Sequence, residues 1–260
     1  MRLLKISKKT AIIIPIKKYE KSKTRLSPYL SFEERKCLTR MLVLDTLEKV
    51  YQLKNSQTIV VSSEILQLPN KFHDVVIIDE DSSGSSATDS SSSSSRGNGV
   101  NNAINLANKF IENSYHCFSE SIILPIDLPL LSIEDLQKII NYSRRFENCV
   151  CIVPSKRYDG TNLLLRKPNS IVDTFYDNNS FYNHIKAANE KRLIIKIFNY
   201  QSLMIDLDTF EDIIDILKIC KNMDYTLKLK KYKLKESRSL NFLKDLIKEK
   251  NNKHNGDLNI

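Results

Sequence analysis

Short runs of apolar and β-branched residues alternate with longer amphipathic segments along most of the chain. Several of the short runs are apolar throughout, as expected of strands that are covered on both faces of a sheet. The strands that these runs predict are Thr10–Ile16, Thr58–Ser62, Val75–Asp79, Ser121–Ile126, Cys149–Pro154, Asn162–Arg166, Leu193–Phe198 and Leu203–Leu207.

Helix signals fall between the predicted strands. The segment from Ser31 to Glu34 is a capping box, which predicts a helix that runs to about Leu53. Ser132 and Thr209 each precede acidic residues of a first helical turn, which predicts two more helices. This alternation of strands and helices predicts an α/β fold, namely a three-layer αβα sandwich with a mixed, mostly parallel sheet.

The length and composition limit the class of protein. With 260 residues, the chain can bury one sizeable core. No apolar run approaches the ~20 residues that span a bilayer, and the apolar run near the N-terminus is short and lacks a small-residue cleavage site. The five cysteines are scattered, which favours free thiols in a reducing compartment. We therefore expect a cytoplasmic protein with no membrane partner.

Two segments differ from the rest in composition. Between Ser82 and Ser95, ten of fourteen residues are serine, which predicts a disordered surface insertion at residues 82–95. Residues 226–260 form a basic C-terminal extension with one amphipathic helix, whose apolar positions are Leu240, Leu243, Leu246 and Ile247. A solvated tail is the favoured interpretation of this extension, with a subunit contact or attraction to polyanions as alternatives. We therefore predict one domain over residues 1–225, followed by the extension.

The net charge of +9 is concentrated near the two ends of the chain. Residues 1–25 carry nine Lys or Arg, and residues 228–260 carry ten. Between these segments, 26 acidic residues outnumber 21 basic ones. A uniformly basic face for nucleic acid would not give this distribution, so we expect no specific nucleic-acid partner.

Five cations follow the first predicted strand within nine positions, in the sequence IIPIKKYEKSKTRL. Open α/β sheets bind ligands beyond the carboxyl ends of their strands. Lys17, Lys23 and Arg25 could therefore form a cradle for a polyphosphate, in which lysine supplies point charge and arginine a bidentate fork. The spacing is not that of a P-loop. A solvated charge run is the alternative for the whole segment.

Carboxylates follow two other predicted strands. Asp127 lies between two prolines, and Asp206 and Asp208 share one face of a predicted strand. Three carboxylates at two strand ends could hold one Mg²⁺, which takes oxygen ligands and usually obtains further ones from phosphates. The alternatives are a helix N-cap for Asp208 and a turn-forming role for Asp127.

Three further segments carry small polar residues. Gly99 and Asn101 follow the serine-rich segment, where glycine permits close backbone approach and an Asn amide can hydrogen-bond a base edge. Thr161 and Asn162 enter a strand after a tight turn, and Ser180 opens a helical run at which backbone N–H groups suit a phosphate. Ordinary turn and cap chemistry is the alternative for each segment.

Taken in order, these motifs resemble the phospholactate guanylyltransferase family of coenzyme F420 biosynthesis, over about residues 10 to 220. The matching segments are Pro15-Ile16-Lys17, Ser22 to Ser27, Leu30 to Arg35, Gly99 to Ala103, Leu124 to Leu131, Asp159 to Leu165, Ser180-Phe181 with His184, and Asp206 to Thr209. The resemblance implies a nucleotidyltransferase with the nucleotide-diphospho-sugar transferase (GT-A-like) fold. It also implies a transfer from GTP to 2-phospho-L-lactate that yields lactyl-2-diphospho-5'-guanosine and pyrophosphate.

The same resemblance implies roles for individual residues. Lys17, Lys23 and Arg25 would contact the phosphates of GTP, and Lys18 and Lys21 would remain in solvent. Gly99 and Asn101 would lie on the guanine side. The residues implied as Mg²⁺ ligands are Asp127, Asp206 and Asp208, of which Asp127 is also implied to be catalytic. The residues implied to contact the small phospho-acid are Thr161, Asn162 and Ser180.

Two other functions compete with this interpretation. One is a nucleotidyltransferase of the same fold that uses phosphoenolpyruvate or 3-phosphoglycerate, since residue types do not distinguish these acceptors. The other is a nucleotide- or nucleic-acid-binding protein without catalysis, which the basic termini favour and the acidic middle of the chain disfavours. A homodimer is a further hypothesis. The serine-rich insertion departs from the family pattern, and the basic extension has no counterpart in it.

Overall fold

A computed structural model of the chain describes residues 9–81, 99–114, 118–222 and 237–253. The predicted disordered insertion at residues 82–95 lies outside the described residues. No helix in the described ranges is long and apolar enough to cross a membrane.

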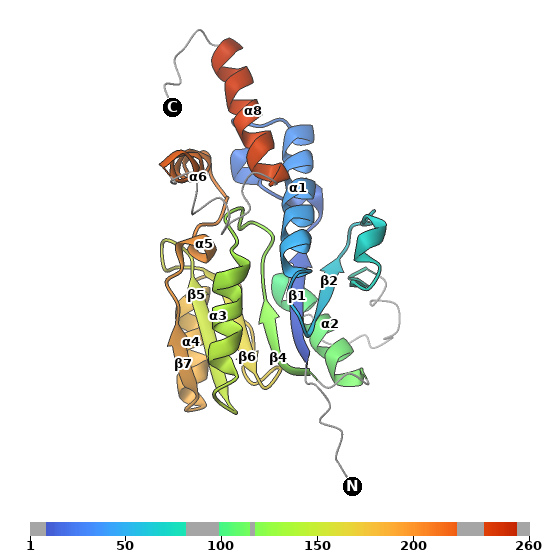
Figure 1. The fold of residues 1–260 in the computed structure, drawn as a ribbon, viewed down its shortest axis with the longest axis vertical. Coiled ribbons are helices and arrows are strands. Elements are labelled where there is room, and N and C mark those ends of the chain that lie inside the picture. The colour runs from blue at the N-terminus through green and yellow to red at the C-terminus, as the bar shows by residue number, and fades with distance from the viewer. Residues whose placement is uncertain (1–8, 82–98, 115–117, 223–236, 254–260) are drawn as a thin grey trace, which may run out of the picture.

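A seven-stranded sheet forms the centre of the fold, in the order β3-β2-β1-β4-β6-β5-β7 (Figure 1). The strands are β1 Lys9–Ile16, β2 Ser56–Ser62, β3 Val76–Asp79, β4 Phe118–Ile123, β5 Cys149–Pro154, β6 Thr161–Lys167 and β7 Ile194–Ile197. Strand β6 runs antiparallel to both of its neighbours, β4 and β5, and the other neighbouring strands are parallel. The start of β6 therefore lies at the same edge of the sheet as the carboxyl ends of the other strands.

Helices cover both faces of this sheet. The longer helices are α1 Phe32–Val50, α2 Val100–Asn113, α3 Ile133–Ser143, α4 Ser180–Glu190, α6 Phe210–Asn222 and α8 Arg238–Lys253. The short ones are α5 Gln201–Met204 and the 3-10 turns η1 Tyr19–Lys21, η2 Thr24–Leu26 and η3 Asn70–Phe72. Along β1, Ile12 and Ile14 pack with α1 and α3, whereas Ala11 and Ile13 pack with α2 and α4. This two-residue period places one apolar layer on each face and confirms the predicted three-layer fold.

The capping box at the start of α1 is present as the sequence predicts. The Ser31 hydroxyl accepts from the Glu34 N–H, and the Glu34 carboxylate accepts from the Ser31 N–H. The helix ends at Val50 and continues as a turn to Leu53, which is close to the predicted end.

The predicted strand at Leu203–Leu207 is wrong. Gln201–Met204 forms helix α5, and residues 205–208 have no regular secondary structure. Leu203 is buried against the α1 and α3 layer, whereas Ile205 and Leu207 are buried in a separate cluster with α6 and α8. An apolar run signals burial, and here burial comes from helix packing without strand pairing.

The interpretation of the C-terminal extension as a solvated tail is also wrong for α8. Leu240, Leu243, Leu246 and Ile247 are buried against α1 and α6, so the predicted amphipathic helix is confirmed but packs on the domain (Figure 1). The buried carboxylate of Asp45 on α1 accepts hydrogen bonds from the N–H groups and side chains that begin α8. This anion at the start of a helix fixes α8 in place.

Candidate active site

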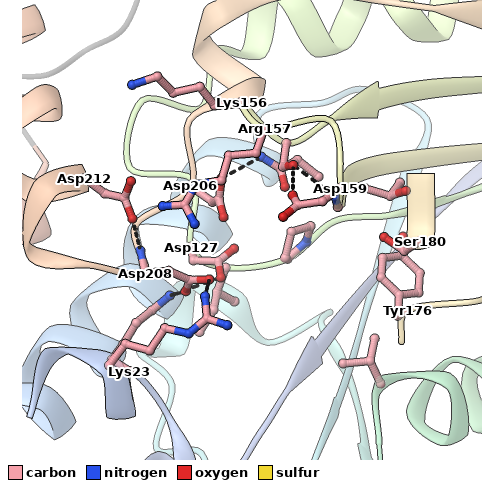
Figure 2. A pocket seen from close by; sticks show the side chains of 18 of the residues that line it. Lys23, Asp127, Lys156, Arg157, Asp159, Tyr176, Ser180, Asp206, Asp208 and Asp212 are labelled. Carbon is pink, nitrogen blue, oxygen red and sulfur yellow. Dashed lines mark hydrogen bonds and ion pairs between the residues drawn. The ribbon is translucent and has the colours of Figure 1, made fainter. Parts of the chain in front are cut away.

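A cavity of about 1150 Å³ opens at the carboxyl edge of the sheet. It is lined by the segment after β1, the loop after β4, the turn between β5 and β6, the residues that begin α4, and residues 205–215 around the start of α6. Figure 2 shows the carboxylates of Asp127, Asp206 and Asp208 gathered on one side, with Ser180 and Tyr176 on the other. Segments far apart in the sequence thus meet in one polar cavity.

Most of the residues that the sequence selects line this cavity. They are Lys17, Lys23, Arg25, Asp127, Thr161, Asn162, Ser180, Asp206 and Asp208. Gly99 and Asn101 do not line it, although Val100 between them does. Lys21 is exposed, as predicted, although it also lines the cavity, and Lys18 forms an exposed ion pair with Asp81.

Lys23 lies at the centre of the acidic side of the cavity. Its Nζ is 3.1 Å from Asp127 Oδ2 and 3.0 Å from Asp208 Oδ1, and its side chain is only 4% exposed. Burial by itself lowers the pKa of Lys23, but Asp127 and Asp208 together raise that pKa above its ordinary value. Lys23 therefore stays protonated and bridges the two carboxylates.

Arg25 and Lys17 add positive charge at the rim. Arg25 Nη1 is 3.9 Å from Asp208 Oδ2, and the arginine side chain is 69% exposed. Lys17 follows directly on β1 and is exposed where it lines the cavity. Both cations are therefore accessible to an anionic ligand.

Helix α1 fixes the loop that carries Asp127. Thr46 Oγ1 donates to the Ile126 carbonyl at 3.3 Å, and Lys49 Nζ donates to the Pro129 carbonyl at 3.0 Å. Burial lowers the pKa of Lys49 to about 8, so that this lysine is still largely protonated at neutral pH. The loop therefore rests on α1 on both sides of Asp127, and the Asp127 carboxylate is left for Lys23.

The backbone also joins the two acidic segments. The Leu207 N–H donates to the Asp127 carbonyl at 2.9 Å. Asp206 Oδ1 accepts from Asn162 Nδ2 at 3.4 Å, and the same amide donates to the Met204 carbonyl at 3.0 Å. Asn162 at the start of β6 thus orients the segment that carries Asp206 and Asp208, although that segment is not a strand.

The alternative interpretation of Asp208 as a helix cap is wrong. The Asp212 N–H donates to Thr209 Oγ1 at 3.3 Å, and Asp212 Oδ2 accepts from the Thr209 N–H at 2.7 Å and from the Asp208 N–H at 3.0 Å. Thr209 and Asp212 therefore cap α6 between them. The Asp208 side chain is left to face Lys23 in the cavity.

Like charge accumulates on this side of the cavity. Burial raises the pKa of Asp206 to about 6, and repulsion from Asp127 and Asp208 adds to the rise. For Asp208, burial would also raise the pKa, but Lys23, with Arg25 and Lys17 behind it, holds that pKa below its ordinary value. Asp206 is thus the least compensated carboxylate of the three.

The donor set matches Mg²⁺ in chemistry but not in arrangement. The three carboxylates on this side of the cavity supply the oxygen ligands that Mg²⁺ prefers, and the repulsion at Asp206 would be relieved by a divalent cation. However, Lys23 bridges two of the three, and within the described ranges no group of three or more His, Cys, Asp or Glu side chains is placed to hold a metal. Metal binding here would require Lys23 to move.

The other side of the cavity is polar and built around α4. Ser180 begins α4, and Asn179 before it makes no side-chain capping hydrogen bond in the described part of the chain. Thr161 Oγ1 lies 3.0 Å from Nδ1 of His184, one helical turn after Ser180. Burial lowers the pKa of His184 to about 4, and the nearby Arg166 contributes to the shift.

The predicted guanine-side residues are placed differently. The Asn101 Oδ1 accepts from the Tyr176 N–H at 3.0 Å, and its Nδ2 donates to Asp177 Oδ2 at 3.2 Å. Asn101 thus joins the start of α2 to the loop before α4. Gly99 has an extended backbone, and a Cβ built there would meet no described atom within 4 Å, so the fold itself does not require glycine.

Sequence reasoning missed several residues that line the cavity. Lys156 and Arg157 lie in the turn shortly after β5, so the same rule that selected Asp127 could have found them. Asp159 also lines the cavity and accepts from Ser155 Oγ at 2.8 Å. Tyr176 comes from a loop, and no signal in the sequence marks it.

Comparisons with known proteins place the chain in a family. Residues 10–242 match a family model described as guanylyl transferase, CofC like. A 2-phospho-L-lactate guanylyltransferase of Methanocaldococcus vulcanius is 34% identical over 207 residues, which cover 79% of this chain and 83% of that protein. A protein of the same name from Methanobrevibacter smithii is 28% identical and covers 85% and 90% of the two chains.

Solved structures show the same fold. A protein from Desulfovibrio desulfuricans, provisionally named a nucleotide-diphospho-sugar transferase, superposes with a TM-score of 0.66 at 17% identity, over 93% of this chain and 98% of that one. A 4-diphosphocytidyl-2C-methyl-D-erythritol synthase has a TM-score of 0.51 at 12% identity, over 83% and 99%. These likenesses confirm the predicted nucleotide-diphospho-sugar transferase fold.

Proposed function

Because the chain belongs to the family of CofC-like guanylyl transferases, we propose that it transfers the guanylyl group of GTP to 2-phospho-L-lactate. The products would be lactyl-2-diphospho-5'-guanosine and pyrophosphate, in the biosynthesis of coenzyme F420. The observation that carries this proposal is the meeting of cations, three aspartates and a polar helix start in one cavity. A nucleoside triphosphate and a small phospho-acid need those three groups together.

The proposed reaction requires no protein nucleophile. A phosphate oxygen of the acceptor forms a bond to the α-phosphorus of GTP, and the bond from that phosphorus to the oxygen of the leaving pyrophosphate breaks. Both reactants are anions, so their mutual repulsion and the charge on the leaving group oppose the reaction. Lys17, Lys23 and Arg25 would offset that charge. Binding of both reactants in the correct relative orientation would supply the rest of the rate enhancement.

The three aspartates would hold Mg²⁺. When bound, Mg²⁺ supplies charge neutralisation to the triphosphate and its leaving group. For Asp127 and Asp208 to act as ligands, Lys23 has to leave the position in which it bridges them. We propose that the Lys23 ammonium then contacts phosphate oxygens of GTP, because the same segment carries Lys17 and Arg25.

The acceptor would bind on the α4 side of the cavity. Thr161 and Ser180 line that region, and N–H groups at the start of a helix favour an anion. The Asn162 amide contacts Asp206 and the Met204 carbonyl, so its contact with the acceptor stays a prediction. Guanine recognition by Gly99 and Asn101 stays a prediction, since the Asn101 amide here is hydrogen-bonded within the protein. The homodimer and the cytoplasmic location likewise remain predictions.

The test is an acceptor panel. Purified protein is mixed with GTP and Mg²⁺, and 2-phospho-L-lactate, phosphoenolpyruvate or 3-phosphoglycerate is added in turn. Pyrophosphate release is followed, and the GMP-linked product is identified by its mass. We expect the highest kcat/KM with 2-phospho-L-lactate. A higher kcat/KM with phosphoenolpyruvate would show that the proposed acceptor is wrong and that guanylyl transfer is right. No pyrophosphate release with any acceptor would contradict both the acceptor and the transfer.

A further inference from the structure

His184 is a buried histidine that lies behind the α4 side of the cavity. It sits on α4 and is 0% exposed. Its Nε2 lies 2.9 Å from the backbone nitrogen of Phe175, and its Nδ1 lies 3.0 Å from Thr161 Oγ1. The ring also contacts Tyr176 edge-on, at a centroid distance of 5.1 Å. The imidazole thus joins α4, the start of β6 and the loop before α4.

These two contacts fix the tautomer of His184. A backbone N–H can only donate, so Nε2 must be the acceptor and carry no proton. The neutral ring then carries its proton on Nδ1 and donates it to Thr161 Oγ1. Burial keeps the ring neutral, since the pKa of His184 lies at about 4 and a protonated ring would turn a second donor toward the Phe175 N–H.

The fixed tautomer determines what Thr161 can offer to a ligand. The Thr161 oxygen accepts a hydrogen bond from His184. Among the described residues, this is the one hydrogen bond of the Thr161 hydroxyl. The hydroxyl proton is therefore free to point elsewhere, and Thr161 lines the cavity. Phosphate and carboxylate oxygens of an ionised phospho-acid only accept, so a hydroxyl held as a donor favours them.

We propose that His184 is a positioning residue that holds the Thr161 hydroxyl as a hydrogen-bond donor toward the anionic acceptor, an inference that rests on the proposed transfer to a phospho-acid. Its alternative is a purely structural histidine that fills space between Tyr176 and Phe175. The two differ in which contact of the ring matters. In the positioning role the Nδ1 contact is the essential one, whereas in the structural role both contacts and the ring volume contribute alike.

Two substitutions separate the contacts. In His184→Asn, the amide nitrogen can take the place of Nδ1 and still donate to Thr161. In His184→Gln, the amide oxygen can take the place of Nε2 and accept from Phe175, but no donor faces Thr161. His73→Gln is the matched control, because His73 is exposed and lies outside the cavity lining.

The measurements are the KM for 2-phospho-L-lactate, the KM for GTP, and the dissociation constant of 2-phospho-L-lactate in the presence of Mg²⁺ and a GTP analogue that cannot react. His184→Gln should raise the KM and the dissociation constant for the phospho-acid about tenfold, the scale of one hydrogen bond to a charged group, with the KM for GTP unchanged. His184→Asn should stay within about threefold of wild type, because its amide still donates to Thr161. Equal losses in the two variants would overturn the positioning role.

The tautomer is tested without turnover. In ¹⁵N spectra, the ring signals of His184 are assigned as those that disappear in both variants. These signals should show a protonated Nδ1 and an unprotonated Nε2. The opposite tautomer would overturn the inference. Wild-type protein that binds 2-phospho-L-lactate but transfers no guanylyl group would overturn the proposed function and leave this inference standing. Wild-type protein that binds no phospho-acid would overturn this inference.

Discussion

Lys23 Nζ lies 3.1 Å from Asp127 Oδ2, which joins the segment after β1 to the loop after β4 across 104 residues of sequence. The lysine side chain is almost fully buried, whereas Asp127 is 24% exposed. The ammonium therefore screens an acidic cluster that would otherwise repel itself. It also occupies the position that a metal ion between these carboxylates would need.

Lys23→Met should lower both stability and activity. Loss of the ammonium leaves Asp127 and Asp208 uncompensated, so we expect the free energy of unfolding to fall by about 1–2 kcal/mol, an amount limited by the partial exposure of both carboxylates. The kcat should fall roughly 10²–10³-fold. Mg²⁺ should raise the melting temperature of this variant more than that of wild type, since the ion no longer displaces a cation.

The control for this experiment is Lys18→Met. Lys18 pairs with Asp81 at an exposed position outside the cavity lining. This change should leave activity unchanged and stability close to that of wild type, because an exposed ion pair contributes little. A loss of activity equal to that of Lys23→Met would contradict the separate roles of the two lysines.

Asp206→Asn should have opposite effects on stability and activity. The substitution removes a carboxylate that Asp127 and Asp208 repel, so metal-free protein should be more stable by about 1 kcal/mol at neutral pH. Guanylyl transfer should fall roughly 10²–10⁴-fold. Thermal unfolding with and without Mg²⁺ checks the account, because the stabilisation that we expect Mg²⁺ to give wild type should be reduced in the variant. Unchanged Mg²⁺ stabilisation would remove Asp206 from the ligand set.

His184 should make stability depend on pH. Its pKa is about 4 in the folded protein, below the ordinary value of 6.5, so the unfolded chain binds the additional proton between these values. The contribution to stability is present above pH 6.5 and is lost as the pH falls toward 4, by up to about 3 kcal/mol. Denaturant unfolding of wild type and of His184→Asn over this range should show the difference. Parallel stability profiles for the two proteins would show that folding does not lower the pKa of His184.

Asp45→Ala should release α8 from the domain. The Asp45 carboxylate is buried and accepts from the N–H groups of Arg238 and Ser239 and from the hydroxyls of Ser237 and Ser239. The change should cost about 3 kcal/mol and speed amide exchange along α8. Glu48→Gln is the control, since Glu48 is part-exposed and pairs with Arg238 and Lys71. It should cost less than about 1 kcal/mol.

Much of the site could be predicted from the sequence because the carboxyl edge of an α/β sheet gathers the residues that follow its strands. That rule brought Lys17, Lys23 and Asp127 together, and it also applies to Lys156 and Arg157, which were missed. Thr161 and Asn162 reach the same edge for a different reason, since β6 runs in the opposite direction and begins there.

The rest depends on tertiary packing that sequence patterns do not encode. The apolar residues Ile205 and Leu207 predicted a strand, but they are buried against α6 and α8. The basic composition of the C-terminal extension suggested a tail exposed to solvent. Instead, the apolar face of α8 packs against α1. The tautomer of His184 follows from two contacts, with Thr161 and Phe175, that only the fold creates.

The central claim is guanylyl transfer at this cavity, and one measurement tests it most directly. Wild-type protein and Asp127→Asn are each incubated with GTP, Mg²⁺ and 2-phospho-L-lactate, and the GMP-linked product is quantified by mass spectrometry. We predict lactyl-2-diphospho-5'-guanosine from wild type and roughly 10²–10⁴-fold less from the variant. No product from wild type, or equal product from both proteins, would contradict the account.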